Sequence, residues 1–415
     1  MLAGMTESVS PASTVGARAA RVLVHELLRR PGPKTGMLVG AAPGSPVLAA
    51  AIDALLPEDS LTVVTQHPEL TRAHVAGLGR WVVDRVRVVD DPAAAGPADV
   101  LVVGEPLRGS AEEVRSTLET YAKHLAPGGV LAAATVALPG IAAGASAELE
   151  RQSALYGVGS DLVLRNLPPL RVHRLRWTDP DPQLADRLTA VDRPSSVALT
   201  RQLHIDSNGV VAAGVAVGLA ALARWSRPSS KLWLLPAAAA LPVAAFFRDP
   251  HREPPEDPSL VVAASDGKVL SVERVTDDRF NPDGTTSEYL RIAVFLSVLD
   301  VHVNRAPVAG KVVDYFRTDG GYAPAMAPEA ERNVSAYTVL ETSHGRVAVA
   351  QRTGLVARRI VQRAPVGALL ARGERFGLIR FGSRTDVYLP ADAADPLVAA
   401  GDRVAGGSTP IARWL

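Results

Sequence analysis

Apolar residues follow three different patterns along the chain, and the first predicts an α/β domain. Up to residue 180, short apolar runs alternate with segments in which apolar residues recur at helical spacing. The runs cover residues 36–40, 61–65, 86–89, 99–103 and 130–134. Strands separated by helices favour a mostly parallel sheet covered on both faces. We therefore predict a Rossmann-like domain over residues 1–180, with a flexible leader up to about residue 20 and a helix within 15–30.

The second pattern consists of two continuous apolar runs that follow a polar, proline-containing linker at residues 181–208. They cover residues 209–223 and 232–247, and a basic turn with Trp225 joins them. Each run is shorter than the roughly 20 residues that span a bilayer. Tryptophan beside cations is typical of the headgroup level. We predict a membrane-associating helical hairpin at 209–247 that dips into one leaflet; the alternative is a buried helix pair in a soluble core.

The third pattern, over residues 248–415, is β-like with frequent glycine. Residues 308–313 and 346–351 are typical of strands. The predicted fold class is therefore α/β plus mainly-β, in the order Rossmann-like domain, apolar hairpin and β-rich domain.

Composition removes several classes of function. Lysine and arginine total 44 and aspartate and glutamate 43, so the net charge of +1 gives no reason to expect a nucleic-acid partner. The chain has no cysteine, which excludes disulfides, thiolate metal sites and a cysteine nucleophile. We predict no metal site. Covalent chemistry must then use serine, threonine, lysine, a carboxylate or a group that the protein makes from itself.

The segment 376–390 contains a Gly382-Ser383 pair within β-rich sequence. A serine hydroxyl there lies beside a carbonyl carbon that no Cβ shields, which suits attack by the chain on itself. Three other segments stand out between the apolar hairpin and this one. They are Phe246-Phe-Arg-Asp-Pro-His-Arg252, Ala264-Ser-Asp-Gly-Lys-Val269 and Phe295-Leu-Ser-Val-Leu-Asp-Val-His-Val-Asn-Arg-Ala-Pro307.

In this order, just after an apolar segment, the four motifs resemble phosphatidylserine decarboxylase proenzymes of the short bacterial and archaeal-type subfamily. The resemblance covers about residues 205–415. It implies self-cleavage of the Gly382-Ser383 bond: the serine hydroxyl attacks the preceding carbonyl to give an ester, loss of the Cα proton expels the upstream chain, and the dehydroalanine hydrolyses to a pyruvoyl group. Chains 1–382 (β) and 383–415 (α) would result.

The same resemblance implies the reaction and the site residues. The pyruvoyl cofactor made from Ser383 would accept the amine of phosphatidylserine, and loss of CO₂ would give phosphatidylethanolamine in phospholipid biosynthesis. Asp266 and His302 would complete a catalytic set with Ser383, and Arg305 and Asn304 would contact the substrate. Longer members of the family carry a second histidine where this chain has Arg305, which puts the base role on His302.

Two other residues compete for these roles. Gly406-Gly-Ser-Thr409 resembles the cleavage tetrapeptide of the longer enzymes, but cleavage before Ser408 would leave only residues 408–415. The surrounding sequence therefore favours Ser383. His344 is the reserve candidate for the base.

The predicted Rossmann-like domain resembles methyltransferases that bind S-adenosylmethionine, chiefly in the turn Leu125-Ala-Pro-Gly-Gly129. Its markers depart from that pattern, because Gln66 replaces the acidic residue that usually follows the second strand. Asp90 or Asp91 could meet an adenine edge. A degenerate or regulatory domain is favoured over an active methyltransferase, and binding of S-adenosylmethionine stays open.

Taken together, the sequence predicts an enzyme at the cytoplasmic face of the cell membrane, peripheral or monotopic. Its partners would be phosphatidylserine, the membrane surface and its own cleaved chains, and the oligomeric state stays open. Two alternatives are a bifunctional decarboxylase and methyltransferase, and an uncleaved pseudoenzyme that binds membranes.

Overall fold

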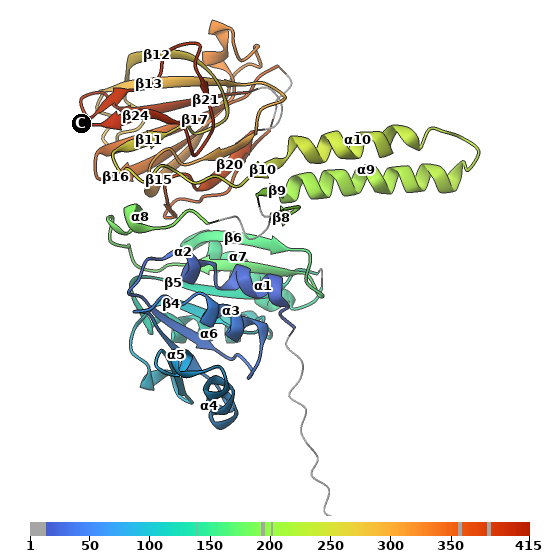
Figure 1. Cartoon of the computed structure of the whole chain (residues 1–415), viewed down its shortest axis with the longest axis vertical. Helices are drawn as coiled ribbons and strands as arrows, with labels where there is room; N and C mark the ends of the chain where they lie inside the picture. Colours follow the sequence, from blue (N-terminus) through green and yellow to red (C-terminus); the bar gives the residue numbers. More distant parts are fainter. Residues whose placement is uncertain (1–13, 139, 192–195, 201, 356–358, 380–382) are drawn as a thin grey trace, which may run out of the picture. The chain divides into compact units, whose positions relative to one another are not determined.

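The computed structural model describes residues 14–138, 140–191, 196–200, 202–355, 359–379 and 383–415. The chain divides into two compact units, Met1–Pro180 and Asp181–Leu415 (Figure 1). Each unit has its own sheets and its own hydrophobic core.

The first unit is built on a seven-stranded sheet with the order β3-β2-β1-β4-β5-β7-β6. Strands β1 to β5 pair in parallel, and β7 runs antiparallel to both β5 and β6. The strands are β1 Thr35–Val39, β2 Ser60–Val64, β3 Val86–Val89, β4 Ala98–Val103, β5 Leu125–Val136, β6 Gly157–Val163 and β7 Leu170–Leu175. The order β3-β2-β1-β4-β5 is that of a doubly wound Rossmann-like sheet, as predicted.

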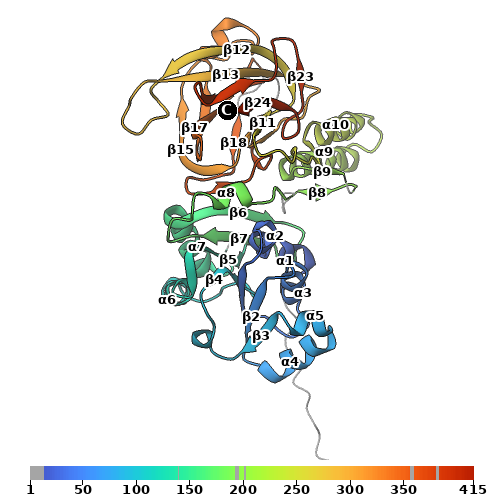
Figure 2. The same ribbon diagram turned by 60° about the vertical axis from the view of Figure 1, so that its left-hand side comes forward.

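Helices cover both faces of this sheet. Figure 2 shows α1, α2 and α3 on one side and α6 and α7 on the other. Val100 and Val102 of β4 join the core beneath the first group, whereas Leu101 and Val103 join the core beneath the second. The helices are α1 Ala17–Leu23, α2 His25–Arg29, α3 Pro46–Asp53, α4 Pro68–Gly77, α5 Arg80–Val83, α6 Ala111–Ala122 and α7 Ala143–Tyr156, with a 3₁₀ turn η1 at Pro92–Ala94. The one helix predicted within 15–30 is thus two short helices.

The second unit is mainly antiparallel β, which confirms the predicted class. An eight-stranded sheet has the order β19-β15-β16-β17-β21-β13-β12-β23, and three-stranded sheets have the orders β11-β24-β22, β14-β20-β18 and β10-β9-β8. The strands are β8 Val197–Ala198, β9 Leu203–Ile205, β10 Arg248–Pro250, β11 Leu260–Val262, β12 Gly267–Asp277, β13 Ser287–Leu296, β14 Val303–Arg305, β15 Gly310–Thr318, β16 Ser335–Thr342, β17 Gly345–Arg352, β18 Ile360–Gln362, β19 Leu369–Leu370, β20 Arg375–Ile379, β21 Ser383–Pro390, β22 Ala394–Pro396, β23 Arg403–Val404 and β24 Pro410–Trp414. A 3₁₀ turn η2 covers Pro328–Arg332.

Strand β21 lies in the middle of the eight-stranded sheet, between β17 and β13. Its side chains alternate between the two faces, as in any strand. Val387 and Leu389 pack into the larger core of the unit, and Tyr388 packs into a smaller aromatic cluster on the opposite face. This alternation decides on which side each polar residue at the start of β21 lies.

Residues 181–208, predicted as a linker, are grouped with the second unit and carry secondary structure. Helix α8 covers Leu184–Arg187, and strand β9 pairs with β10 so that His204 lies opposite Asp249. Strands β8 and β9 have only two and three residues, which is too short for a recognisable apolar pattern within this polar, proline-containing segment.

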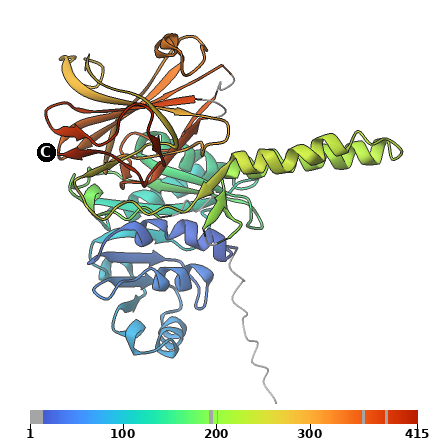
Figure 3. The same ribbon diagram turned by 45° about the horizontal axis from the view of Figure 1, so that its top comes forward.

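Two apolar helices, α9 Ser207–Ser226 and α10 Leu234–Phe246, lie side by side and extend away from the strands of their unit (Figures 1 and 3). Asp206 caps α9 by accepting a hydrogen bond from the Asn208 amide at 2.9 Å. Helix α9 is longer than the predicted apolar run 209–223, because it continues through Arg224 to Ser226. By its 20 residues and its composition alone, it could cross a membrane.

Most apolar side chains of this hairpin are exposed within the second unit. They include Val211, Val215, Val217, Leu219, Leu222, Leu235 and Leu241. A helix that is apolar on all sides is normally buried in a core or inserted in a membrane. Because these side chains are exposed, the alternative of a buried helix pair does not fit the structure.

Candidate active site

Ser383 is the first residue of β21 and is completely buried. It pairs with Leu296, the last residue of β13. Its hydroxyl has no hydrogen-bond partner among the described residues. Gly382, the other half of the predicted cleavage site, lies outside the described residues. A buried hydroxyl without a partner lowers the stability of the fold, so this serine is a candidate for a chemical role.

His302 is held near the same end of the sheet by two strand pairings. Leu296 lies opposite Ser383, and the chain from Leu296 reaches His302 six residues later. The carbonyl oxygen of His302 then accepts a hydrogen bond from the amide of Ile379 at 3.2 Å, four residues before Ser383. The segment that carries His302 is therefore bonded to the chain both before Ser383, at Ile379, and at Ser383 itself, through Leu296.

The His302 side chain is a buried neutral imidazole. Its Nδ1 lies 2.9 Å from the carbonyl oxygen of Asp300, which can only accept, so Nδ1 carries the proton. Nε2 then has a free lone pair and no partner among the described residues. Burial lowers the pKa of His302 to about 4, although the hydrogen bond to Asp300 acts in the opposite direction. The ring also packs on Phe246, with 4.2 Å between ring centroids.

Asp266 makes contacts that were not predicted. Its carboxylate forms a two-point ion pair with Arg252, in which Nη2 and Oδ2 are 2.7 Å apart. It also accepts a hydrogen bond from the Gly406 amide at 2.9 Å. Its charge nevertheless acts on His302, since it is one of the smaller influences that raise the pKa of that imidazole. Asp266 therefore acts on His302 through its charge, with no hydrogen bond between them among the described contacts.

Two buried side-chain amides lie on the same face as Ser383. Asn304 is fully buried and accepts a hydrogen bond from Gln351 Nε2 at 2.7 Å. Gln351 lies opposite Thr385 in the β17–β21 pairing, and Thr385 shares a face with Ser383. Asn304 Nδ2 and Gln351 Oε1 have no partner among the described residues. One donor and one acceptor are therefore free beside the serine.

Sequence reasoning missed Gln351, although a signal was present. It continues the alternation of Val347 and Val349, which pack into the core, so a polar residue occupies a core position of β17. A buried amide in such a position needs a partner or a function.

Arg305 does not have the free guanidinium that substrate binding requires. It is buried, and its Nη2 donates to Asp249 Oδ1 and to the carbonyl oxygen of Pro250, both at 2.8 Å. A further bond of 3.3 Å reaches the carbonyl oxygen of Gly373. These contacts join β10 to β14, so the predicted contact of Arg305 with the substrate is not supported.

The two competing residues make other contacts, although Ser408 lies only two residues after Gly406, whose amide bonds to Asp266. Ser408 is in a turn, where its hydroxyl donates to the carbonyl oxygen of Ala405 at 3.3 Å. His344 is exposed and stacks on Trp414, with ring centroids 4.4 Å apart. It lines a separate cavity of about 750 Å³ with Asp186 and other residues.

The first unit has a cavity of about 850 Å³ at the carboxyl ends of its parallel strands. In doubly wound sheets this edge is where ligands bind. Gln66 and Asp90, both singled out from the sequence, line the cavity together with Glu105, Arg108 and Tyr121.

Comparisons with known proteins agree with the geometry of the second unit. The family model for phosphatidylserine decarboxylase matches residues 240–412. The phosphatidylserine decarboxylase proenzyme of Thermobifida fusca is 46% identical over 199 residues, which are 48% of this chain and 86% of that protein. The putative archaetidylserine decarboxylase proenzyme of Methanothermobacter thermautotrophicus is 44% identical over 179 residues, or 41% of this chain and 79% of that protein.

Solved structures with a likeness to part of the chain include methyltransferases. The O-methyltransferase TomG from Streptomyces achromogenes has a TM-score of 0.29 and 15% identity, and the match covers 39% of this chain and 79% of that one. TrmN from Thermus thermophilus has a TM-score of 0.32 and 17% identity over 40% of this chain and 49% of its own. The strand order of the first unit is what classifies it as Rossmann-like.

The motifs, the buried serine and histidine, and relatives matched over most of their length all agree on the second unit. The chain therefore belongs to the phosphatidylserine decarboxylase family and is a decarboxylase with a Rossmann-like unit ahead of it.

Proposed function

We propose that the second unit cleaves its own chain between Gly382 and Ser383 and then converts phosphatidylserine to phosphatidylethanolamine and CO₂. The observation that carries this proposal is the buried Ser383 hydroxyl, which has no partner among the residues that the structure describes and lies at the end of the sheet where a neutral His302 also lies. Most buried hydroxyls are bonded, and the described residues include one other exception, Thr71 in the first unit.

His302 is suited to activate the serine. A general base needs a free lone pair at the working pH, and the imidazole keeps Nε2 unprotonated because burial lowers its pKa to about 4. The bond between Nδ1 and the Asp300 carbonyl fixes the ring and this tautomer. Nε2 takes the hydroxyl proton as Ser383 Oγ attacks the carbonyl carbon of residue 382. The ion pair of Asp266 with Arg252 keeps a carboxylate charge nearby that stabilises the resulting imidazolium.

The surroundings of Ser383 fit the pyruvoyl group that the family implies. When formed, this group supplies an electron sink for the loss of the substrate carboxylate. Asn304 Nδ2 and Gln351 Oε1, which have no partner among the described residues, can serve as a donor to a substrate carboxylate or carbonyl oxygen and as an acceptor from the substrate amine. The strands around Ser383 exclude water, which strengthens both contacts.

The apolar hairpin brings the membrane close to this site. Phe246, the last residue of α10, packs on His302, and Phe246 and Phe247 form one cluster with Leu378 of β20. At the start of α9, Asp206 donates its amide to the Phe247 carbonyl oxygen at 2.9 Å, and its carboxylate is paired with Arg363. The hairpin inserts into the bilayer, with the enzyme at the cytoplasmic face of the cell membrane, so that a lipid headgroup reaches Ser383 while its acyl chains stay in the bilayer.

A second function is favoured for the first unit by its cavity, which has the position of a nucleotide site in Rossmann-like folds. Gln66 can hydrogen-bond a ribose hydroxyl, but without the charge of a carboxylate the bond is weaker. The unit therefore binds S-adenosylmethionine weakly and acts as a regulatory domain, or it makes the protein bifunctional by methylating a lipid product.

Ser383→Ala should abolish both self-cleavage and decarboxylation, because the attacking hydroxyl is lost. Mass spectrometry of the purified chain should then show only the full-length protein, whereas the unaltered protein yields residues 383–415 as a separate fragment. Ser408→Ala is the matched control and should cleave and react normally. If the unaltered protein is never cleaved, the result would instead support the membrane-binding pseudoenzyme. A cleavage defect in Ser408→Ala would indicate that cleavage occurs before Ser408.

The rate of self-cleavage should be almost independent of pH between about 5.5 and 7.5. Protonation removes the lone pair of His302, and a pKa lowered to about 4 delays protonation until the pH approaches that value. An ordinary histidine, with a pKa of about 6.5, would lose roughly tenfold in its neutral fraction at pH 5.5. Chain made by cell-free translation can be shifted to each pH and sampled for fragment 383–415. A tenfold fall by pH 5.5 would argue against His302 as the base.

Val215→Asp combined with Leu219→Asp should weaken binding to phospholipid vesicles at least tenfold. An aspartate at the centre of a membrane helix costs about 2.5–3.5 kcal/mol, and about 1.4 kcal/mol is a factor of ten. Sedimentation with vesicles containing phosphatidylserine measures the effect. Leu397→Asp, at an exposed apolar residue outside the hairpin, is the control and should bind as before. Equal binding by all three proteins would refute insertion of the hairpin.

Gln66→Glu should tighten binding of S-adenosylmethionine to the full chain by about tenfold, because a charged acceptor gains about 1.4 kcal/mol over a neutral amide. Isothermal titration calorimetry measures this change. Gln183→Glu, in an exposed position of the second unit, should leave binding unaltered. No binding by either the unaltered chain or Gln66→Glu would exclude the cofactor.

A further inference from the structure

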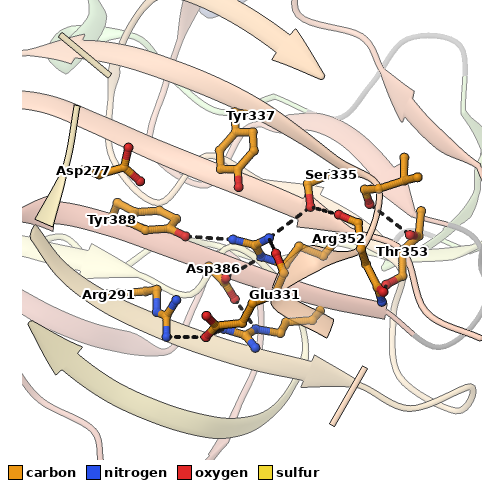
Figure 4. Close-up of polar contacts among 12 residues, drawn as sticks. Asp277, Arg291, Glu331, Ser335, Tyr337, Arg352, Thr353, Asp386 and Tyr388 are labelled. Carbon is orange, nitrogen blue, oxygen red and sulfur yellow. Dashed lines mark hydrogen bonds and ion pairs between the residues drawn. The ribbon is translucent and has the colours of Figure 1, made fainter. Parts of the chain in front are cut away.

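The two charged residues that follow Ser383 on β21 belong to a buried ionic cluster on the opposite face of the sheet. Asp386 is fully buried between two guanidinium groups. Its Oδ1 accepts from Arg384 Nε at 2.6 Å, and its Oδ2 accepts from Arg352 Nε at 2.7 Å. Figure 4 shows Asp386 and Arg352 side by side with Tyr388.

The cluster ties β21 to both neighbouring strands. Arg352, from β17, also donates to the Tyr388 hydroxyl at 3.0 Å, to Ser335 Oγ at 3.1 Å and to the carbonyl oxygen of Glu331 at 2.8 Å. The Glu331 carboxylate accepts from Arg291 Nη2, on β13, at 2.7 Å (Figure 4). It also lies 3.7 Å from Arg384 Nη2. We call Arg291, Glu331, Arg352, Arg384 and Asp386 the ionic clamp.

Stability alone does not account for the ionic clamp. Arg352 and Arg384 lie directly opposite each other across β17 and β21, and both are almost fully buried. Like charges in that relation destabilise a sheet, and each buried ion loses its hydration, so that Asp386 between them has to offset both costs. Well-packed apolar residues at such sites are often as stable. Departures from local rules of this kind concentrate at functional sites.

Self-cleavage creates a new chain end that the ionic clamp can hold in place. In the intact chain, residue 383 is held by the backbone on both sides. After cleavage it is a chain end, joined only to Arg384, and a pyruvoyl group made from Ser383 has no N–H to donate to the neighbouring strand. New chain ends fray unless side chains hold them. Arg384 carries the first side chain after the reactive group.

We propose that the ionic clamp holds the start of β21 in register after self-cleavage, and so positions the reactive group against His302, Asn304 and Gln351. This inference rests on the proposed function. The clamp residues are positioning residues, because they lie on the face of the sheet opposite to Ser383 and do not contact the substrate. A displacement of about 1 Å at a reacting centre can cost about a hundredfold in rate.

Arg384→Gln separates this role from the cleavage step. The variant removes the charge and shortens the side chain by two atoms, but keeps a polar group at its end. We expect cleavage within about threefold of the normal rate, because the intact backbone still holds Ser383. The cleaved enzyme should lose at least tenfold in kcat for phosphatidylserine with KM changed less than twofold, and fragment 383–415 should be released at a lower urea concentration.

Two further variants complete the test. Arg384→Lys keeps the charge and should recover part of kcat, which also decides the outcome if Arg384→Gln fails to fold. Arg274→Gln breaks an exposed ion pair with Glu288 on the same sheet and should behave as the unaltered protein. Normal kcat in both Arg384 variants would overturn the proposal, as would equal losses in cleavage rate and kcat. If the unaltered chain itself does not cleave, the proposed function fails instead.

Discussion

The alternation of side chains along β21 is the constraint on which the site depends. The strand lies between β13 and β17, so its two faces point to different surroundings. Ser383 and Thr385 face the side that holds Asn304 and Gln351, whereas Arg384 and Asp386 lie on the opposite face, within the ionic clamp. A shift of one residue in register would exchange the two sets and bury charges in the apolar core. The clamp and the core therefore specify the same register from opposite faces.

Much of the architecture could be predicted from periodicity. The parallel strands of the first unit are short apolar runs, and each of the five predicted runs overlaps one of β1 to β5. The β-rich class of the second unit was also predictable, although short strands such as β8, β9 and β19 were not. Such strands bury few side chains, so their position is set by pairing with distant segments and leaves little local pattern.

The site was predictable only in part, because contacts between distant segments leave no local pattern in the sequence. The motifs indicated Ser383 and His302, and both are buried, with no partner for Ser383 Oγ or His302 Nε2 among the described residues. The motifs did not reveal that Arg305 is paired with Asp249, or that Asp266 is paired with Arg252, because each partner lies in a different motif. A charged residue in a motif can bind a substrate or another motif, and only three-dimensional contacts distinguish these uses.

The contact between Phe246 and His302 joins the apolar hairpin to the segment that carries the candidate histidine. Phe246 ends the apolar helix α10, and the next residues form β10, which Arg305 holds against β14. The hairpin is thus linked to the imidazole through one packed ring and one short strand. The same packing keeps His302 dry, and burial is the largest influence on its pKa. The apolar hairpin and the buried His302 side chain are therefore parts of one packed region of the second unit.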